Sequence, residues 1–272
     1  MVARFWMEAA HRLQLLVHSA SPFMNLSGKV ALVTGGTKGI GAASAIVLAR
    51  EGADVVISGR NKDAEALATL ASIQSLGRRT HLILADLTNP AESTRLVQET
   101  IQKLGRLDVL VHSAGGPVPG GLFELTPEQW HGAFDAHVHA IFYLCRAAIP
   151  SMRERKEGAI VLISSTAGIR GIVTNVAYQV AKGAIPQFTR ALAREFANDN
   201  IRVNCVAPGV VRTAFHATMS EAQKKLNLEQ RIPLHREGTP EQVGTLIAEL
   251  VKNDYITGET MTIDGGLTMR IA

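Results

Sequence analysis

The sequence TGGTKGIG, residues 34–41, closes an apolar run that starts at Val30 and opens an amphipathic stretch that starts at Ile40. A backbone that turns sharply here and then approaches an anion needs glycine, because a Cβ would stand in the way. The amino end of the following helix presents free N–H groups and a positive dipole end to such an anion. This stretch therefore predicts a strand–turn–helix unit that cradles a phosphate.

The rest of the chain repeats this alternation of short β-branched runs and amphipathic stretches of helix length. The predicted strands are Val30–Thr34, Val55–Ser58, His81–Ala85, Val109–His112, Ala159–Ser164, Val203–Val206 and Met261–Ile263. The predicted helices are Ile40–Glu51, Ala64–Leu76, Ala91–Leu104, Pro127–Met152, Ala177–Ala197 and Pro240–Val251. Most strands are continuous apolar runs, which is typical of strands buried on both faces of a parallel sheet. We predict an α/β fold, a Rossmann-type doubly wound parallel sheet of about seven strands flanked by helices.

The chain shows no Pro- or Ser-rich linker and no repeat, so residues 26–272 are predicted to form one domain. We expect residues 1–25 to be an N-terminal extension of the fold, with a weak amphipathic targeting segment as the alternative. Residues 210–234 are polar and irregular, and predict a mobile lid over the substrate or else a plain surface insertion. Pro186 predicts either a kink in its helix or a helix held tightly by its neighbours.

The composition narrows the classes of partner. The formal net charge is +4 and the basic residues are scattered, which argues against a nucleic-acid partner. No apolar run reaches the ~18 residues that span a membrane, so no membrane segment is expected. Cys145 and Cys205 lie in apolar segments and are read as buried hydrophobic residues. No Cys/His cluster predicts a metal, and we expect a cytoplasmic location.

A tyrosine and a lysine four residues apart, Tyr178 and Lys182, fall in a predicted helix. That spacing places both on one face, where a nearby ammonium favours the phenolate and lowers the pKa of the tyrosine. A tyrosine in this setting can pass a proton to or from a reacting oxygen. Ser165 follows the fifth strand, and its hydroxyl can hydrogen-bond the same oxygen.

The choice between dinucleotide cofactors depends on the end of the second strand, VVISGRN, residues 55–61. A carboxylate at this position accepts the ribose hydroxyl of NAD, but here it is replaced by Gly59 followed by Arg60. A guanidinium binds a 2′-phosphate with a bidentate fork, and Lys38 in the glycine turn offers a second cation. We therefore predict NADP(H), with NAD(H) as the weaker alternative.

Together these motifs resemble the short-chain dehydrogenase/reductase family, whose patterns are T-G-x-x-x-G-x-G and Y-x-x-x-K, over roughly residues 26–267. The resemblance implies hydride transfer between nicotinamide and a ketone or secondary alcohol, with Tyr178, Lys182 and Ser165 catalytic. The offset of 13 residues (178 − 165) selects Ser165 over Ser164. The cofactor-binding residues that it implies are Gly35, Thr37, Lys38, Gly39, Ile40, Gly41, Arg60, Asp86, Leu87, Ser113, Ala114, Gly115, Tyr178, Lys182, Pro208, Gly209, Val211 and Thr213. Asp86 has helix N-capping as an alternative role.

The chain departs from the family pattern in two places, after the fourth strand and at the fourth catalytic residue. The family usually has N-N-A-G after the fourth strand, whereas this chain has His112-Ser113-Ala114-Gly115. The fourth catalytic residue of the family is usually an asparagine, and ungapped counting from Gly115 places His137 there. A histidine keeps the main-chain carbonyl of that asparagine, which leaves a structural substitution and a proton relay of its own as alternatives.

The chain is similar both to 3-oxoacyl-acyl-carrier-protein reductases and to sugar and polyol dehydrogenases of this family. A basic group before the fifth strand would favour an acidic carrier protein, but Asp199 weakens that interpretation. The expected pocket residues are mostly apolar and favour an acyl, ring or other apolar carbonyl substrate: Pro117, Val118, Pro119, Ile169, Ile172 and Val173. A non-catalytic NADP(H)-binding sensor is the alternative from another class. The resemblance also implies a homotetramer, or else a dimer.

Overall fold

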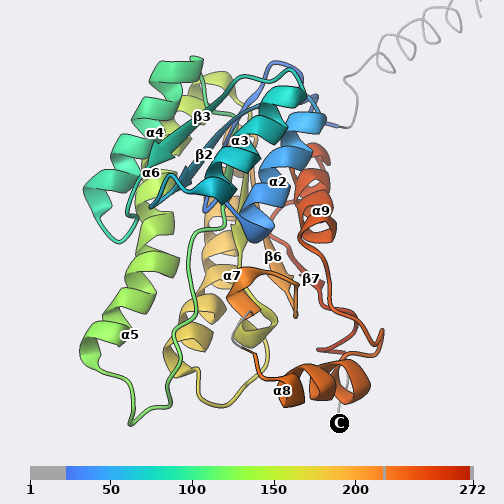
Figure 1. Ribbon diagram of the computed structural model, residues 1–272. Coiled ribbons are helices and arrows are strands. Elements are labelled where there is room, and N and C mark those ends of the chain that lie inside the picture. Colours follow the sequence, from blue (N-terminus) through green and yellow to red (C-terminus); the bar gives the residue numbers. More distant parts are fainter. Residues whose placement is uncertain (1–22, 217–218, 270–272) are drawn as a thin grey trace, which may run out of the picture.

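The computed structural model describes residues 23–216 and 219–269. In this part of the chain seven strands form one parallel sheet in the order β3-β2-β1-β4-β5-β6-β7 (Figure 1). The strands are β1 (Val30–Thr34), β2 (Asp54–Gly59), β3 (Thr80–Leu84), β4 (Val109–His112), β5 (Gly158–Ile163), β6 (Ile201–Pro208) and β7 (Thr260–Ile263). The strand order reverses between β1 and β4, so the predicted doubly wound parallel sheet is confirmed.

Helices cover both faces of the sheet. One face carries α2 (Gly39–Arg50), α3 (Ala64–Ser75) and α9 (Pro240–Lys252), with α2 and α9 packed side by side (Figure 1). The other face carries α4 (Pro90–Leu104), α6 (Ala140–Arg155) and α7 (Val176–Phe196). Successive residues of β1 alternate between the two cores: Val30 and Leu32 pack on the second face, Ala31 and Val33 on the first. Burial on both sides explains why the strands read as unbroken apolar runs.

One predicted helix is wrong in its continuity. The stretch predicted as Pro127–Met152 is divided into α5 (Pro127–Phe134), a π-helical turn, η1 (Asp135–His139), and α6. A π turn inserts one residue into the helix and turns side chains out of their α-helical register. His137 lies in the middle of this turn. Apolar periodicity does not reveal the insertion, because the backbone stays helical on both sides.

The helix around Pro186 is not interrupted. α7 runs through Pro186 without a break in its helical assignment, in agreement with a helix held by its neighbours; a kink at Pro186 stays a prediction. Ile185 and Thr189 on either side of the proline are both fully buried. The contact that compensates the proline lies at Lys182, four residues earlier.

The segment 210–234 is less irregular than its composition predicts. It contains two short helices, η4 (Ala214–His216) and α8 (Glu221–Leu226), and a second π turn, η5 (Asn227–Arg231). Ser220 caps α8 with a reciprocal capping box to Gln223, a local signal that polar composition alone does not convey. Motion of the segment 210–234 over a substrate stays a prediction.

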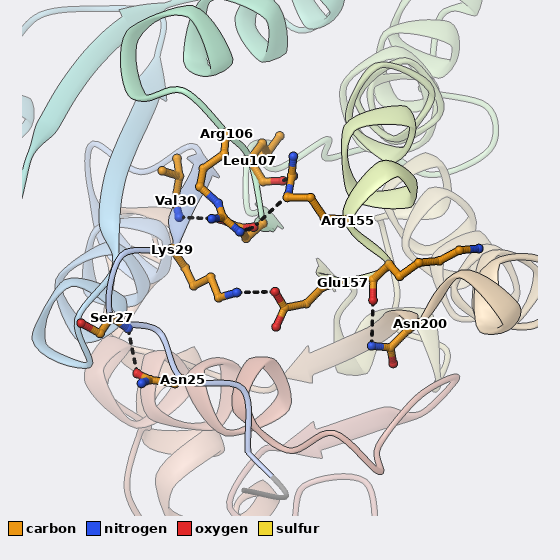
Figure 2. Close-up of polar contacts among 11 residues, drawn as sticks. Asn25, Ser27, Lys29, Val30, Arg106, Leu107, Arg155, Glu157 and Asn200 are labelled. Atoms are coloured by element: carbon orange, nitrogen blue, oxygen red, sulfur yellow. Dashed lines mark hydrogen bonds and ion pairs between the residues drawn. The ribbon is translucent and has the colours of Figure 1, made fainter. Parts of the chain in front are cut away.

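The amino ends of the strands are joined by charged contacts (Figure 2). Asp108 is fully buried and accepts hydrogen bonds from the backbone N–H of Val30 at 2.9 Å and from Arg106 at 2.8 Å. Arg155 donates to the carbonyl of Leu107 at 2.6 Å, and Lys29 pairs with Glu157 (Figure 2). These contacts tie β1, β4 and the end of α6 together at the edge opposite the glycine turn.

The chain meets this edge from its first described residues. Phe23 forms an antiparallel bridge with Asn253, and the N–H of Met24 donates to the carbonyl of Lys252 at 2.7 Å. The predicted N-terminal extension otherwise lies outside the described residues. Among residues 23–216 and 219–269, no helix has the length and apolar character needed to cross a membrane.

Candidate active site

The glycine-rich turn after β1 is closed by backbone contacts that exclude side chains. A Cβ on Gly35, whose φ is +63°, would lie 2.8 Å from the backbone of Ala114. A Cβ on Gly41 would lie 2.1 Å from the carbonyl oxygen of Gly35. Gly39 also has a positive φ, +56°, which favours glycine. The turn therefore needs glycine at these positions, as the sequence predicts.

The amino end of α2 is open to an anion. Its N-cap residue is Lys38, whose side chain makes no capping hydrogen bond, and the first turn holds no acidic residue. By contrast α3, α4 and α9 have side-chain caps, from Asp63, Asn89 and Thr239. Uncapped N–H groups at the carboxyl edge of a parallel sheet fit a pyrophosphate. The residues present here therefore fit a dinucleotide cofactor.

The turn after β4 is fastened to the glycine turn by Thr34. The backbone N–H of Ser113 donates to its carbonyl at 3.2 Å, and that of Ala114 lies 3.3 Å from its Oγ1. The same hydroxyl lies 2.9 Å from Nδ1 of His112, which is 1% exposed. Thr34 and His112 thus organise the predicted cofactor-binding segment 113–115. The sequence motifs assign neither residue a role, although a polar residue at the end of an apolar strand is a usable signal.

The segment after β6 reaches the same place. The N–H of Gly209 donates to the carbonyl of Ile263 at 2.9 Å, and a Cβ on Gly209 would collide with Asp264. The Thr213 methyl would lie 3.4 Å from a Cβ on Gly39, so this threonine stands at the amino end of α2. Val211 is buried, 3% exposed, just before it. The structure therefore brings residues 208–213 together with the glycine turn, as the motif predicts.

Tyr178 lies in the first turn of α7 and is 9% exposed. Burial raises the pKa of Tyr178, and a side-chain hydrogen bond with Ser165 opposes that shift. Ser165 follows β5, and its Oγ also accepts the N–H of Ala167 at 3.1 Å. The ring of Phe215, from η4, lies 5.7 Å from the tyrosine ring, centroid to centroid. The serine and the tyrosine predicted as partners are thus in contact.

Lys182 lies one turn further along α7 and is 6% exposed. Its ammonium donates to the carbonyl of Ile163 at 2.7 Å and lies 5.8 Å from the centroid of the Tyr178 ring. Burial lowers the pKa of Lys182 to about 8. The lowered pKa expected for Tyr178 is not met in the protein alone, where burial of the phenol raises its pKa.

His137 points from the π turn into this group. Its Nε2 donates to the carbonyl of Gly116 at 3.0 Å, and its ring meets that of Tyr178 edge-on with centroids 5.5 Å apart. A Cβ on Gly115 would lie 2.1 Å from the imidazole, so the ring fills the space that this glycine leaves. Burial, reinforced by the Lys182 ammonium, lowers the pKa of His137 to about 3. The imidazole is therefore neutral at physiological pH.

The end of β2 carries the features on which the cofactor prediction depends. Arg60 and Lys38 are exposed, and the Lys38 ammonium lies 3.9 Å from Glu65. A Cβ on Gly59 would lie 2.7 Å from Cγ2 and 2.9 Å from Oγ1 of Thr37, which is 7% exposed. The glycine turn thus occupies the space that a longer residue at position 59 would need.

Asp86 and Leu87, after β3, differ in their surroundings. Asp86 is exposed and accepts the N–H of Thr88 at 3.1 Å and its hydroxyl at 2.8 Å. These bonds hold the pKa of Asp86 below its usual value, and the Arg60 guanidinium acts in the same direction. Asn89 is the N-cap of α4, so the capping role suggested for Asp86 is wrong. Leu87 is buried in the core of the α4 face.

Known proteins with a similar sequence or structure belong to one family. Residues 35–268 match a family model described as enoyl-(acyl carrier protein) reductase. A double mutant of the Serratia marcescens short-chain dehydrogenase/reductase has the same fold, with a TM-score of 0.84 and 31% identity over 90% of this chain and 100% of the mutant. The chain belongs to the short-chain dehydrogenase/reductase family. The resemblance read from the motifs is confirmed, and the family is one of oxidoreductases.

Other short-chain dehydrogenase/reductase relatives are similar over nearly their whole length. The 3-oxoacyl-[acyl-carrier-protein] reductase of Chlamydia muridarum is 36% identical over 89% of this chain and 98% of the relative. A protein of the same description from Thermotoga maritima is 34% identical over 90% of this chain and 100% of the relative. A blue fluorescent protein from a metagenomic library, solved in complex with NADPH, is 34% identical with a TM-score of 0.84, over 90% and 100% of the two chains.

Proposed function

We propose that this short-chain dehydrogenase/reductase uses NADP(H) to interconvert an apolar ketone and its secondary alcohol. The observation that carries the proposal is the contact of Ser165 with the buried Tyr178, with Lys182 one helical turn away. This group lies at the sheet edge where the uncapped end of α2 offers its N–H groups. A proton-transfer residue and an anion cradle at one edge are what dehydrogenase chemistry requires.

The proposed catalytic residues act at one atom, the carbonyl oxygen of the substrate. NADP(H), when bound, supplies or accepts the hydride. Tyr178 gives its hydroxyl proton to the carbonyl oxygen during reduction and takes the proton back during oxidation. Ser165 hydrogen-bonds the same oxygen and orients the phenol. Lys182, kept charged below about pH 8, stabilises the phenolate form and binds the nicotinamide ribose.

His137 holds the site in shape and does not relay protons in this proposal. A relay by protonation needs a pKa near neutrality, whereas burial and Lys182 lower the pKa of His137 to about 3. Its Nε2 hydrogen bond to Gly116 and its edge-on contact with Tyr178 support a positioning role. This is the structural substitution for the asparagine of the family.

Preference for NADP(H) over NAD(H) rests on charge and on space. Arg60 and Lys38 are both exposed and can approach a 2′-phosphate, although Lys38 lies 3.9 Å from Glu65 and Arg60 also acts on Asp86. A carboxylate at position 59, which NAD needs, would clash with Thr37, because a Cβ there would lie 2.7 Å from the threonine Cγ2. The NADPH complex of the related blue fluorescent protein supports the same choice.

The substrate that we propose is a free apolar ketone, with a 3-oxoacyl thioester as one member of that class. Val173, at 85% exposure, and Ile172, at 40%, offer apolar surface in the loop before Tyr178. Part of the positive charge of the basic group that would attract an acidic carrier protein is offset within the chain. Arg153 and Lys156 both pair with Asp199, at 2.8 and 2.5 Å.

The third member of that basic group is also engaged. Arg155 donates to the carbonyl of Leu107 (Figure 2). Its Nε also lies 3.5 Å from the buried carboxylate of Asp108. A carrier protein would have to displace these internal contacts before its own acidic groups could pair with the cations. A sugar or polyol substrate is the alternative, and the apolar lining argues against it.

The test measures NADPH and NADH oxidation with four carbonyl classes: ring ketones, a 3-oxoacyl thioester of a small thiol, the same acyl group on its carrier protein, and ketose sugars. We expect turnover with NADPH and the first two classes. Tyr178→Phe removes the transferred proton and should lower kcat by about 10²–10⁴-fold. Undiminished turnover in that variant would overturn the catalytic assignment. NADPH binding without turnover on any class would instead support a sensor.

The oligomeric state is a separate expectation. A groove of about 420 Å³ lies between α6 and α7, lined by Arg146, Ile149, Pro150, Arg153 and Phe196. Phe142 and Val180, on the same two helices, are each nearly half exposed. A homotetramer would use such a face, and light scattering on the full chain tests it.

A further inference from the structure

Pro186 leaves one carbonyl of α7 without its helical partner. In an α-helix, the carbonyl of residue i accepts the N–H of residue i+4, and proline has no N–H to give. The residue four positions before Pro186 is Lys182, the lysine of the proposed catalytic pair. The break in the hydrogen-bond ladder therefore falls on a residue whose position matters for catalysis.

Ser164 supplies the missing donor. Its Oγ donates to the carbonyl of Lys182 at 2.7 Å, across 18 residues of chain. The serine is 2% exposed and belongs to the end of β5, where its N–H donates to the carbonyl of Val206 at 2.8 Å. A buried carbonyl without a partner is unfavourable, so this hydroxyl replaces what the helix lost.

The same end of β5 holds Lys182 at two further points. Ile163, next to Ser164, accepts the lysine ammonium at 2.7 Å. A Cβ on Gly168, in the turn that follows β5, would lie 2.7 Å from the backbone carbon of Lys182. The turn is therefore packed backbone to backbone on α7 at this residue. The backbone and the ammonium of Lys182 are both fixed by one strand end.

We infer that Ser164 is a positioning residue for Lys182, replacing the N–H that Pro186 lacks. The two adjacent serines then serve the two members of the pair: Ser165 contacts Tyr178, and Ser164 fixes the backbone from which the ammonium reaches toward it. Without this bond, the middle of α7 is free to move away from β5, and the ammonium moves with it. The inference rests on the proposed function, which gives Lys182 its role in catalysis.

Several titratable groups surround the lysine and enter any pH measurement. His112 of β4, His137 of η1 and Cys205 of β6 face it from the neighbouring elements, and Tyr178 lies on its own helix. Burial lowers the pKa of both histidines to about 3 and raises that of the cysteine. Between pH 6 and 9 the groups that change charge here are therefore the lysine and, with cofactor bound, the tyrosine.

Three variants and one control separate the bond from the side chain. Ser164→Ala removes the donor, Pro186→Ala restores a helical N–H, and the double variant combines them. Thr189→Val is the control, because Thr189 Oγ1 also donates to a buried carbonyl of α7, that of Ile185, whose helical donor is intact. Hydrogen exchange of the peptide 180–189 in the full chain with NADPH reports the backbone, and alcohol oxidation across pH 6–9 reports the catalytic pair.

We expect Ser164→Ala to speed amide exchange in this peptide and to lower kcat/KM, each by about tenfold, as loss of a buried hydrogen bond implies. The acid limb of its oxidation profile should move to higher pH, because a displaced ammonium no longer favours the phenolate. The double variant should return exchange, kcat/KM and the acid limb to within about twofold of Pro186→Ala alone. Thr189→Val should leave the acid limb in place.

Unchanged exchange and an unchanged profile in Ser164→Ala would overturn the inference, as would a double variant that folds but stays impaired. If Ser164→Ala does not fold, the double variant compared with Pro186→Ala decides the question alone. Tyr178→Phe is measured in parallel. Full activity in that variant sinks the proposed function, whereas the exchange data still report on Ser164.

Discussion

The contact between Thr37 and Gly59 makes a prediction about space alone. A Cβ at position 59 would lie 2.7 Å from the threonine Cγ2, well inside the carbon–carbon contact distance of about 3.5–4.0 Å. Gly59→Ala should therefore act as an overpacking substitution, which costs about 1–3 kcal/mol. The gain of about 0.4–1 kcal/mol from replacing glycine offsets part of this. With the middle of each range, the net loss of about 1.3 kcal/mol corresponds to a fall in Tm of roughly 3–5 °C.

Removing the threonine methyl and hydroxyl relieves the contact. In Thr37→Ala the nearest remaining atom is the threonine Cβ position, 3.4 Å from the new carbon. The double variant should thus recover most of the loss, which a double-mutant cycle on the cofactor-free protein measures by differential scanning fluorimetry. Gly132→Ala is the matched control, because a Cβ there meets nothing within 4 Å.

The same pair then decides the response to a carboxylate. Gly59→Asp alone should weaken NADPH binding through repulsion of the 2′-phosphate without gaining NADH affinity, because its side chain cannot enter the space that Thr37 fills. Combined with Thr37→Ala, it should bind NADH about tenfold tighter than Gly59→Asp does, by fluorescence titration. Equal NADH affinity in the single and double variants, or additive Tm changes in the cycle, would refute the steric argument.

Three further outcomes are expected. Arg60→Ala should raise the Kd for NADPH about tenfold at low salt and leave that for NADH unchanged, with a smaller difference at high salt; equal losses for both cofactors would contradict the 2′-phosphate assignment. His137→Asn should make the free energy of unfolding less sensitive to acid. The folded pKa of His137, about 3, lies below the unfolded value near 6.5, so the stability of the wild type falls as the pH drops through 6.5, by about 2 kcal/mol at pH 5. Urea unfolding of the variant should not show this loss. Its oxidation profile should keep the wild-type pH dependence, which a relay would not allow. Lys182→Met should remove a group whose folded pKa of about 8 is lower than its unfolded value of about 10.5. The native lysine therefore releases its proton first as the pH rises. The free energy of unfolding of the wild type, relative to that of the variant, should rise between pH 8 and 10.5.

Much of the fold is written locally in the sequence. The predicted bounds of all seven strands lie within two residues of the observed ends, and the continuous apolar runs mark the central strands, whose two faces are both buried. The glycine turn could also be predicted from the sequence, since each essential glycine either has a positive φ or lies where a Cβ would clash with the backbone. The tyrosine and lysine of α7 were found by helical spacing.

What the sequence did not convey depends on contacts between distant segments. The π turn around His137 has no periodicity of its own, and the ring that it directs at Tyr178 comes from 41 residues earlier in the chain (178 − 137). The role of Ser164 has no signal in the sequence, because its partner is the backbone carbonyl of Lys182, which lacks its helical donor only because of Pro186. The raised pKa of Tyr178 also required knowing how deeply the phenol is buried.

The amino and carboxyl ends of the strands contribute unequally to the stability of the fold. At the amino ends of the strands, Lys29, Asp108 and Arg155 form buried or half-buried ionic contacts. At the carboxyl ends, apolar loops such as Ile172–Val173 are exposed to solvent. A library that randomises those open loops would leave the ionic contacts at the amino ends intact and retain most folded clones. The same library placed around Asp108 would be lost largely to misfolding, so new substrate ranges should be sought by diversifying only the open rim.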